Sequence, residues 1–416
     1  MKTAGIIAEY NPFHDGHRYH IEQTRKQTGA DYVIVVMSGD YVQRGEPAIA
    51  DKYTRTRMAL SGGADLVIEL PVVYATASAE YFATAGVKLL NDIGCVDYLS
   101  FGSEWAGEED YVPYVDLFLN EPQDYKQYLK EGLKEGMSFP RARARAAARI
   151  LKDPKAEDFL KEPNHILGIE YGKALKKLRS PMRPVTVKRA GNAYHDESLS
   201  GKYLSATAIR TALFHSLKND EGEQKDKICE LLGDDSQPFL TDFFRGEYVS
   251  WDDLMPFLDY TVLLKKKLLG KYFGMDLELA RRMQNLYEPG LSFETLLERL
   301  HTRQRTDSAL KRALLHICLH IKADPFLEDG GNIPVPYARI LGFSQEAAPL
   351  LKKIRETAKI RLIQRAAEGK KIYEEQTSEG KLFYLDVRSS DFYEQIAARK
   401  AGRLPVSEFS KQQIIL

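Results

Sequence analysis

Cysteine is scarce in this sequence, no apolar run is long, and neither sign of charge is in excess. Its three cysteines, Cys95, Cys229 and Cys318, lie far apart and lack metal-ligand spacing, so we expect free thiols and no metal bound to them. No uncharged run approaches the roughly 20 residues of a membrane span. No signal-peptide pattern precedes the first apolar segment, so we expect a cytoplasmic protein that does not contact a membrane.

Length and charge describe a globular chain larger than one ordinary core. The 416 residues include 59 Lys and Arg and 59 Asp and Glu, so the total charge predicts no partner and only local clusters can. We expect two domains. The polar stretch 218–227 lacks a core pattern and places the boundary after residue 218, with mainly helical periodicity beyond it. Near the C-terminus, the apolar run 382–385 favours a returning strand.

The first part of the chain alternates short apolar runs with helix patterns, which is typical of α/β proteins with a Rossmann-like parallel sheet. The predicted strands cover residues 6–8, 32–37, 66–70, 98–101 and 184–188. Ligands of open parallel sheets bind beyond the carboxyl ends of the strands. The candidate ligand-binding segments are therefore 9–17, 40–44 and 102–104.

Residues 5–17 organise the chain, because an apolar run stops at an Asn-Pro turn and a helix begins a few residues later, running to about Thr28. Backbone N–H groups and the helix dipole then face one point, which favours a bound anion. His14 and His17 would reach the same point. The alternative is a pair of surface histidines beside a turn, but their place between strand and helix favours a phosphate site.

Two motifs resemble signatures of the nucleotidylyltransferase superfamily. The stretch 11–17, Asn-Pro-Phe-His-Asp-Gly-His, is similar to its (H/T)xGH signature, which is related to the HIGH signature of class I aminoacyl-tRNA synthetases. The stretch 203–210, Tyr-Leu-Ser-Ala-Thr-Ala-Ile-Arg, resembles its S-S/A-T-x-I-R signature. The resemblance implies that the histidines donate to phosphate oxygens, and that Ser205, Thr207 and Arg210 hold the outer phosphates of ATP. Ala206 departs from the Ser-Ser-Thr pattern and removes one hydroxyl.

Further stretches sharpen the resemblance. Residues 9–17, 43–47, 63–71 and 101–104 together resemble the bacterial tRNA(Met) cytidine acetate ligase family, and the match runs through most of the chain. The resemblance implies an ATP-dependent ligase that makes acetyl-adenylate from acetate and then acetylates the wobble cytidine of elongator tRNA(Met) to N4-acetylcytidine. Mg²⁺ would accompany the triphosphate. Residues 1–218 would form the ATP-binding catalytic domain and residues 219–416 a tRNA-binding domain.

The same resemblance implies an ATP site at the ends of the predicted strands. Gly102 follows the fourth strand, where a missing side chain lets the backbone approach a nucleoside. Asp40 is a further candidate, from the residues alone, for orienting substrate or Mg²⁺, and we group it with His14, His17 and Arg210 as catalytic. The implied ATP-binding residues are Ile7, Ala8, Glu9, Tyr10, Asn11, Pro12, Phe13, His14, Gly16, His17, His20, Gly102, Asn164, Arg189, Ser205, Thr207 and Arg210.

For Gly102, Asn164 and Arg189, the alternatives are a turn glycine, a helix cap and a solvated arginine. From the residues alone, the cap is the better interpretation of Asn164. For Arg210 the alternative is a surface ion pair, which the hydroxyl groups before it disfavour.

Two basic surfaces are candidates for RNA contact. Arginines between 141 and 149 recur every four residues, so they share one face of a predicted helix, and no acidic partner is evident. A solvated basic face and a phosphate-binding face explain this run equally well. The segment 352–371 holds eight basic residues against two glutamates, a strong segregation for a neutral protein. The predicted RNA-binding residues are Arg141, Arg145, Arg149, Arg361 and Arg365.

Two other functions explain part of these features. An adenylyltransferase acting on a small phosphorylated metabolite would need both phosphate motifs but would leave the basic surfaces unused. A nucleotide-gated RNA-binding factor would use ATP only as a switch. Pyrophosphate exchange separates the three, because it would depend on acetate for the ligase, on a metabolite for the adenylyltransferase, and would be absent for the binding factor. The sequence does not indicate an oligomeric state.

Overall fold

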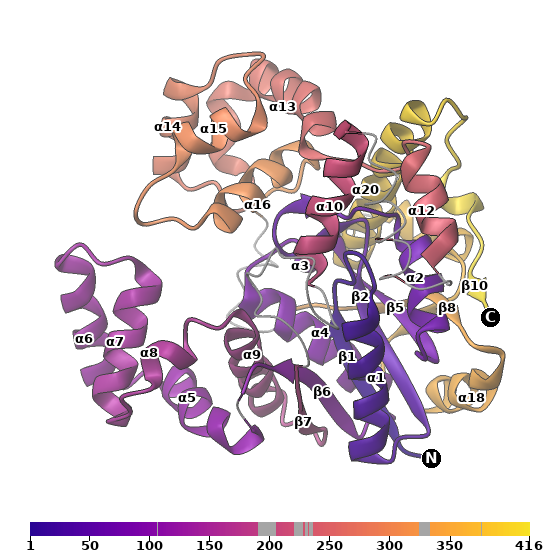
Figure 1. Ribbon diagram of the computed structural model, residues 1–416, viewed down its shortest axis with the longest axis horizontal. Coiled ribbons are helices and arrows are strands. Elements are labelled where there is room, and N and C mark those ends of the chain that lie inside the picture. The colour runs from indigo at the N-terminus through magenta and orange to yellow at the C-terminus, as the bar shows by residue number, and fades with distance from the viewer. Residues whose placement is uncertain are drawn as a thin grey trace.

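The computed structural model describes residues 1–105, 107–189, 205–219, 228, 232, 236–323, 333–375 and 377–416. Within these ranges the molecule is built around one sheet, with helices packed on both of its faces (Figure 1). Its strands are β1 (Thr3–Ala8), β2 (Tyr32–Ser38), β5 (Leu66–Leu70), β6 (Tyr98–Ser103), β7 (Arg183–Lys188), β8 (Tyr337–Phe343), β9 (Arg361–Ile363) and β10 (Ile414–Ile415). Their order is β10-β8-β5-β2-β1-β6-β7, with β9 beside β8.

Strand β2 shows why both faces of this sheet are covered. Ile34 and Val36 pack in one hydrophobic core, whereas Val33, Val35 and Met37 pack in another, and all five are fully buried. Successive side chains of a strand point to opposite faces, so a strand that is apolar at every position is buried on both. Strands β1, β2, β5, β6 and β7 are parallel, which confirms the predicted α/β class.

Strands from the second half of the chain complete the same sheet. β8 pairs antiparallel with β5, and β9 and β10 pair parallel with β8. Helices dominate beyond residue 219, but the sequence pattern did not predict these three strands. The predicted boundary after residue 218 therefore separates two segments that share a sheet. Most of the polar stretch 218–227 lies outside the described residues.

Helices of the first half cover the sheet and also form a lobe beside it. None of the described helices in either half is both long enough and apolar enough to cross a membrane. The first four are α1 (Asp15–Thr28), α2 (Lys52–Ser61), α3 (Val72–Ala75) and α4 (Ala79–Ile93). The next are α5 (Glu108–Asn120), α6 (Gln123–Lys134), α7 (Phe139–Leu151), α8 (Ala156–Phe159) and α9 (Pro163–Lys177). Helices α5 to α8 lead into the lobe at the lower left of Figure 1.

Helix α20 (Ser378–Lys400) corrects one prediction, because the apolar run 382–385 lies inside this 23-residue helix and is not a strand. A short apolar run does not by itself distinguish a strand from a buried helix turn, and the length of the surrounding pattern decides. The other helices are α10 (Ala206–Asn219), α12 (Gln237–Phe244), α13 (Trp251–Lys265), α14 (Leu277–Leu286), α15 (Phe293–Leu300), α16 (Asp307–Cys318), α18 (Ala348–Thr357) and α19 (Lys370–Tyr373), with 3-10 turns η2 (Lys266–Lys271), η3 (Gln345–Ala347), η4 (Ala366–Gly369) and η5 (Glu408–Ser410).

Four buried charges, which we call the ion cluster, join the C-terminal segment to the sheet. Lys52 Nζ lies 2.7 Å from both Glu69 Oε1 and Glu408 Oε1. Arg339 Nη1 lies 3.0 Å from Glu69 Oε2, and the same guanidinium contacts Glu408. These residues come from α2, β5, β8 and η5. Two cations therefore neutralise two carboxylates between segments that are distant in the sequence.

Candidate active site

The loop between β1 and α1 is held by aromatic packing and by a side-chain hydrogen bond. Tyr10, with a left-handed φ of 49°, meets Phe13 edge-on at 4.9 Å between ring centroids. Phe13 lies so close to Gly62, after α2, that a Cβ there would fall 2.1 Å from Phe13 Cζ. Asn11 Oδ1 accepts a hydrogen bond of 2.7 Å from the Ile49 N–H. These contacts fix the loop against the chain around α2.

His14 and His17 cap the N-terminus of α1, because each ring accepts a hydrogen bond from a nearby backbone N–H group. The Gly16 N–H donates to His14 Nδ1 (3.0 Å), and the His14 N–H donates to His17 Nδ1 (3.3 Å). The two ring centroids lie 3.8 Å apart. An imidazole nitrogen that accepts a hydrogen bond carries no proton, so the proton of each neutral ring is on Nε2. Each ring thus keeps an Nε2–H donor on the side away from its capping bond.

Burial keeps these rings uncharged. Burial and the nearby charges of Arg189 and Arg210 together lower the pKa of His14 to about 3. Burial also holds the pKa of His17 well below its usual value, with further lowering from His14, Arg189 and His20. At neutral pH the two histidines therefore act as neutral donors, and the arginines supply the positive charge that phosphate groups require.

His20, one turn beyond His17, is engaged with β6. Its Nε2 lies 3.1 Å from Ser100 Oγ, which in turn lies 2.7 Å from Thr24 Oγ1. Burial and the charge of Arg189 together lower the pKa of His20 to about 4. These contacts hold α1 against β6.

Helix α10 brings the second motif to the same loop. Ser205 Oγ accepts a 3.1 Å hydrogen bond from a backbone N–H in the first turn of this helix. Arg210 Nη1 donates to the Asn11 carbonyl oxygen (2.7 Å), and Arg210 Nη2 lies 3.2 Å from Glu46 Oε1 and 3.4 Å from Thr207 Oγ1. The two motifs, separated by 199 residues at this contact, therefore lie together.

The ends of β6 and β7 contribute the third part of the site. The Arg189 N–H donates to the Ser103 carbonyl (2.9 Å), and a Cβ on Gly102 would fall 3.5 Å from Arg189 Cγ. Burial lowers the pKa of the Arg189 guanidinium, while Glu104 opposes the shift. Asn164, near the start of α9, donates from Nδ2 to the Glu104 carboxylate. Arg189 is near enough to interact electrostatically with both the loop histidines and Glu104.

Comparison with known proteins gives sequence matches that run through most or all of the chain. A HIGH Nucleotidyl Transferase family model matches residues 1–404. The tRNA(Met) cytidine acetate ligase of Thermoanaerobacter sp. (strain X514) is 38% identical over 397 residues, covering 94% of this chain and 95% of that protein. The ligase of Acetivibrio thermocellus is 36% identical over 100% of both chains. This chain belongs to the tRNA(Met) cytidine acetate ligase family.

Solved structures resemble this family member in fold as well. The crystal structure of Thermotoga maritima TmcAL bound with alpha-thio ATP is 30% identical, covers 100% of both chains and has a TM-score of 0.87. The apo form of the same protein has a TM-score of 0.89 at 31% identity. The likeness extends through the sheet and the helices beyond residue 219, which supports the predicted nucleotidylyltransferase fold with a helical part.

Asp40 of this ligase-family chain lies in a different set of charges from the loop histidines. Its Oδ1 accepts a 2.7 Å hydrogen bond from the Lys52 N–H. Burial raises the pKa of Asp40, and the charges that modify this shift are Lys52, Glu408, Lys411 and Asp51. Its hydrogen bond and its electrostatic neighbours therefore belong to the surroundings of the ion cluster.

The basic face of α7 has acidic neighbours that the sequence did not reveal. Arg145 Nη1 lies 2.6 Å from Glu135 Oε2, and Arg149 Nη1 lies 3.4 Å from Glu131 Oε2. The expectation of an unpaired arginine face is therefore wrong, because α6 packs against α7 and brings two glutamates to it. Arg141 is exposed and makes no ion pair within the described part of the chain.

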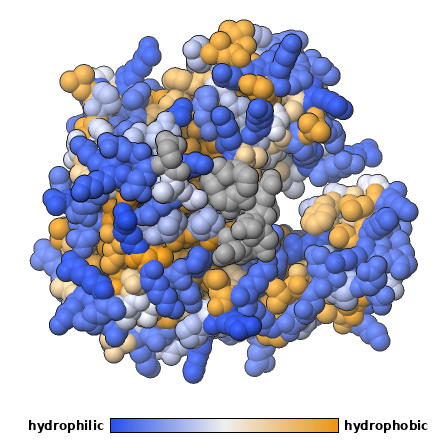
Figure 2. All heavy atoms as spheres, turned by 180° about the vertical axis from the view of Figure 1, so that it is seen from behind, coloured by the Kyte–Doolittle hydropathy of each residue, from blue (hydrophilic) through white to orange (hydrophobic). Residues whose placement is uncertain are grey.

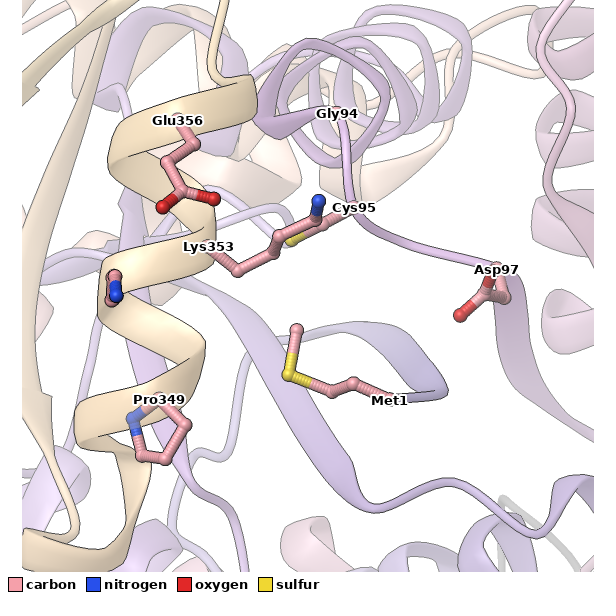
Figure 3. Close-up of a pocket in the computed structure, with 8 residues that line it drawn as sticks. Met1, Gly94, Cys95, Asp97, Pro349, Lys353 and Glu356 are labelled. Carbon is pink, nitrogen blue, oxygen red and sulfur yellow. The ribbon is translucent and has the colours of Figure 1, made fainter.

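The segment 352–371 is divided among several elements. Arg361 on β9 lies 3.3 Å from Glu379, and Arg365 lies 3.3 Å from Glu368, although both arginine side chains stay more than half exposed. Its first two residues, Lys352 and Lys353, line a pocket to which α18 contributes one side, and Figure 3 shows Lys353 there. This pocket is lined by Met1, Gly94, Cys95, Asp97, Pro349, Lys352, Lys353 and Glu356.

This pocket is separate from the candidate active site. Met1 precedes β1, and Cys95 and Asp97 precede β6, so the pocket lies at the amino ends of the parallel strands. The histidine loop follows the carboxyl end of β1. Burial raises the pKa of the Cys95 thiol to about 11, which keeps it protonated and unreactive at neutral pH.

Two functional candidates emerge only from the structure. Glu46, within the stretch 43–47 that carries part of the resemblance, pairs with Arg210, and Glu104 holds Asn164. The position of Glu104 after a predicted strand was a signal, but nothing local in the sequence indicated the partner of either glutamate. Cys95 and Cys318 are free thiols, as predicted, whereas Cys229 and residues 203–204 of the second motif lie outside the described residues. Within the described ranges, no three His, Cys, Asp or Glu side chains form a group that could hold a metal.

Proposed function

We propose that this chain is an ATP-dependent tRNA-modifying ligase that acetylates the wobble cytidine of elongator tRNA(Met). The observation that carries the proposal is the meeting of two neutral histidine donors, His14 and His17, with Arg210 at one helix N-terminus. Family membership and the likeness to a TmcAL structure bound with an ATP analogue support it.

The reaction has two transfers. An acetate oxygen attacks the α-phosphorus of ATP, the bond to the bridging oxygen breaks, and pyrophosphate leaves. The cytidine N4 then attacks the acetyl carbonyl of acetyl-adenylate, AMP leaves, and N4 loses a proton, which yields N4-acetylcytidine. Both steps demand positioning and charge stabilisation more than covalent help from the protein.

Each part of the site has a role in this proposal. The Nε2–H groups of His14 and His17 donate to phosphate oxygens as negative charge builds in the transition state. Ser205, Thr207 and Arg210 hold the leaving pyrophosphate at the start of α10. The nucleoside lies beyond the carboxyl ends of β1 and β6, as ligands of open parallel sheets do.

Some of the remaining ATP-binding candidates border the nucleotide, and others support the residues that do. Residues Ile7 to Phe13 and Gly16 shape the loop through backbone and packing, and His20 braces α1. Gly102 and Arg189 border the nucleoside side of the site. Asp40 is left out of the proposed machinery, because its carboxylate accepts from the Lys52 backbone and lies among the charges of the ion cluster. Mg²⁺ arrives with the triphosphate and is coordinated mainly by phosphate and water.

The tRNA contacts belong to the proposal as well. Residues 1–218 carry the phosphate motifs, and residues 219–416 supply further basic groups for tRNA. Arg141 is the strongest candidate on α7, since it is exposed and without an ion pair within the described residues, while Arg145 and Arg149 share glutamate partners. Arg361 and Arg365 remain more than half exposed and are candidates on the other surface.

Two assays on one preparation test the proposal. Purified protein should catalyse exchange of labelled pyrophosphate into ATP only when acetate is present, and should then introduce N4-acetylcytidine into elongator tRNA(Met), detected by nucleoside mass spectrometry. Exchange that depends on a phosphorylated metabolite would favour an adenylyltransferase. ATP-dependent tRNA binding without any exchange would favour a binding factor.

A further inference from the structure

Glu104 gathers three side chains at the end of β6. Its Oε1 accepts from Asn164 Nδ2, and its Oε2 lies 3.4 Å from His165 Nε2. Its charge also acts on the Arg189 guanidinium. The Glu104 side chain is 15% exposed and His165 is fully buried. One carboxylate therefore connects the start of α9 with the residue that follows β7.

This group lies at the edge of the sheet where the nucleotide is proposed to bind. β1 and β6 are adjacent and parallel, with Ile6 opposite Ser100, so Glu104 leaves β6 beside the histidine loop. Arg189, which influences His14 and Glu104 electrostatically, links the two groups. Asn164 is partly exposed, so its amide is accessible from this edge.

The carboxylate determines which atom Asn164 can present. An ionised carboxylate only accepts hydrogen bonds, so the Asn164 atom facing Glu104 must be the NH₂ group. The amide is planar, and its carbonyl oxygen then points away from Glu104. A carbonyl oxygen accepts from hydroxyl and amino groups and repels phosphate oxygens.

We propose that Glu104 is a positioning residue that orients the Asn164 amide, so that Asn164 Oδ1 accepts a hydrogen bond from a nucleoside hydroxyl or amino group of ATP. The inference rests on the proposed function only in taking ATP as the ligand. It assigns Asn164 to the nucleoside and not to the triphosphate. The neighbouring His165 ring is held separately, with its Nδ1 3.1 Å from the Phe159 carbonyl oxygen.

The sharpest test exchanges the hydrogen-bond donor and acceptor between Glu104 and Asn164. Asn164→Asp should place two carboxylates against each other and raise the Kd for ATP by about tenfold or more. Adding Glu104→Gln to that variant should restore ATP affinity to within about threefold, because the new amide donates to the new carboxylate, which keeps an acceptor for the ligand. A structural role for Glu104 would not produce such rescue. Titration calorimetry with ATP in the absence of acetate measures the affinity, and thermal unfolding confirms that each variant is folded.

ATP analogues identify the donor. Each of 2′-deoxy-ATP, 3′-deoxy-ATP and purine riboside triphosphate lacks one possible donor. Wild-type protein should bind the analogue that lacks the true donor about tenfold more weakly than ATP. Asn164→Ala should bind that analogue and ATP equally. The inference is overturned if Asn164→Asp binds ATP as wild type does, if the double variant is folded but not rescued, or if wild type binds all three analogues as tightly as ATP.

These outcomes are independent of the acetylation reaction. If ATP binds and the donor–acceptor exchange rescues affinity, but pyrophosphate exchange does not require acetate, the proposed function fails and the inference stands. If acetate-dependent exchange is present while Glu104→Leu leaves the Kd for ATP unchanged, the inference fails and the proposed function stands.

Discussion

Where the loop after β1 meets α1, His14 and His17 present neutral imidazoles, whereas the polar side chains buried between α2, β5, β8 and η5 carry full charges. His14 and His17 each use one ring nitrogen for a backbone cap and keep the other as a donor. In the ion cluster, Glu69 and Glu408 each contact both Lys52 and Arg339. The first arrangement retains hydrogen-bonding capacity for a ligand, and the second uses its capacity within the protein.

The difference separates residues that serve the reaction from residues that hold the fold. A buried charge is costly unless it is paired, so the ion cluster stabilises the docking of η5 and β8 only while all four members are present. The histidine rings stay neutral beside Arg189 and Arg210, because protonation would place like charges close together. Five predictions test this contrast, from the largest expected effect to the smallest.

Removing one cation from the ion cluster should cause the largest loss. Arg339→Met leaves two buried carboxylates with a single lysine, and we expect the free energy of unfolding to fall by about 3–5 kcal/mol. Urea denaturation measures it. Arg365→Met, which breaks the exposed pair with Glu368, is the control and should cost less than about 1 kcal/mol. Equal losses for both variants would contradict the distinction.

Removing a loop histidine should damage activity and spare the fold. His17→Ala deletes a donor to the transition state, and we expect acetate-dependent pyrophosphate exchange to slow by on the order of 10²-fold or more. Unfolding by urea should change by less than about 1 kcal/mol, the value of a lost cap. His301→Ala, at an exposed histidine paired with Asp307, is the matched control and should exchange normally. Near-normal acetyl-adenylate formation by His17→Ala would refute the role.

Replacing the guanidinium of Arg210 with a lysine ammonium should show whether its geometry matters in addition to its charge. The guanidinium reaches Asn11, Glu46 and Thr207 together, which a lysine ammonium cannot do in the same geometry. Arg210→Lys should therefore lower the exchange rate by about tenfold or more, the value of a lost charge-assisted hydrogen bond. Wild-type exchange in this variant would leave Arg210 with a general electrostatic role only.

The basic surfaces should affect tRNA and not acetate activation. Charge reversal at Arg141 and Arg145, or at Arg361 and Arg365, should weaken tRNA binding and N4-acetylcytidine formation while acetate-dependent exchange continues. Each phosphate contact that is removed should reduce the salt slope of tRNA binding by about 0.7 to 0.9. Arg141→Ala alone should lower the slope more than Arg145→Ala, because Arg145 is paired with Glu135. A parallel fall in exchange and acetylation would assign these residues to the fold or the nucleotide.

The two clusters should respond to different ranges of pH. Burial lowers the pKa of folded His14 to about 3, while an unfolded histidine titrates near 6.5, so its contribution to stability is complete above pH 6.5 and declines as pH falls toward 3. Contacts with Lys52 and Arg339 lower the pKa of Glu408 despite its burial, so its contribution is lost only below about pH 4.5. Between pH 6 and 8 the exchange rate should show no histidine titration. A rate step near pH 6.5 that disappears in His14→Asn would contradict neutral donors.

Local signals in the sequence were sufficient where the structure depends on neighbouring residues. The caps of α2 are such local features, with Asp51 accepting from the N–H groups of Tyr53 and Thr54 and Gly62 ending the helix. The end of α1 at Thr28 was also predicted, since Gly29 adopts a left-handed φ of 64°. Helix and strand periods repeat within a few residues, which is why such elements were predictable.

The sequence by itself determined the strand-loop-helix of residues 3–28, the second phosphate motif and the α/β class, because each follows from residues close together in the chain. Only the tertiary structure decided that β8 lies against β5, that Glu131 and Glu135 face the arginines of α7, and that Glu104 orients Asn164. The physical reason is that these choices rest on pairing between distant segments, where burial and charge compensation depend on packing that no local pattern encodes.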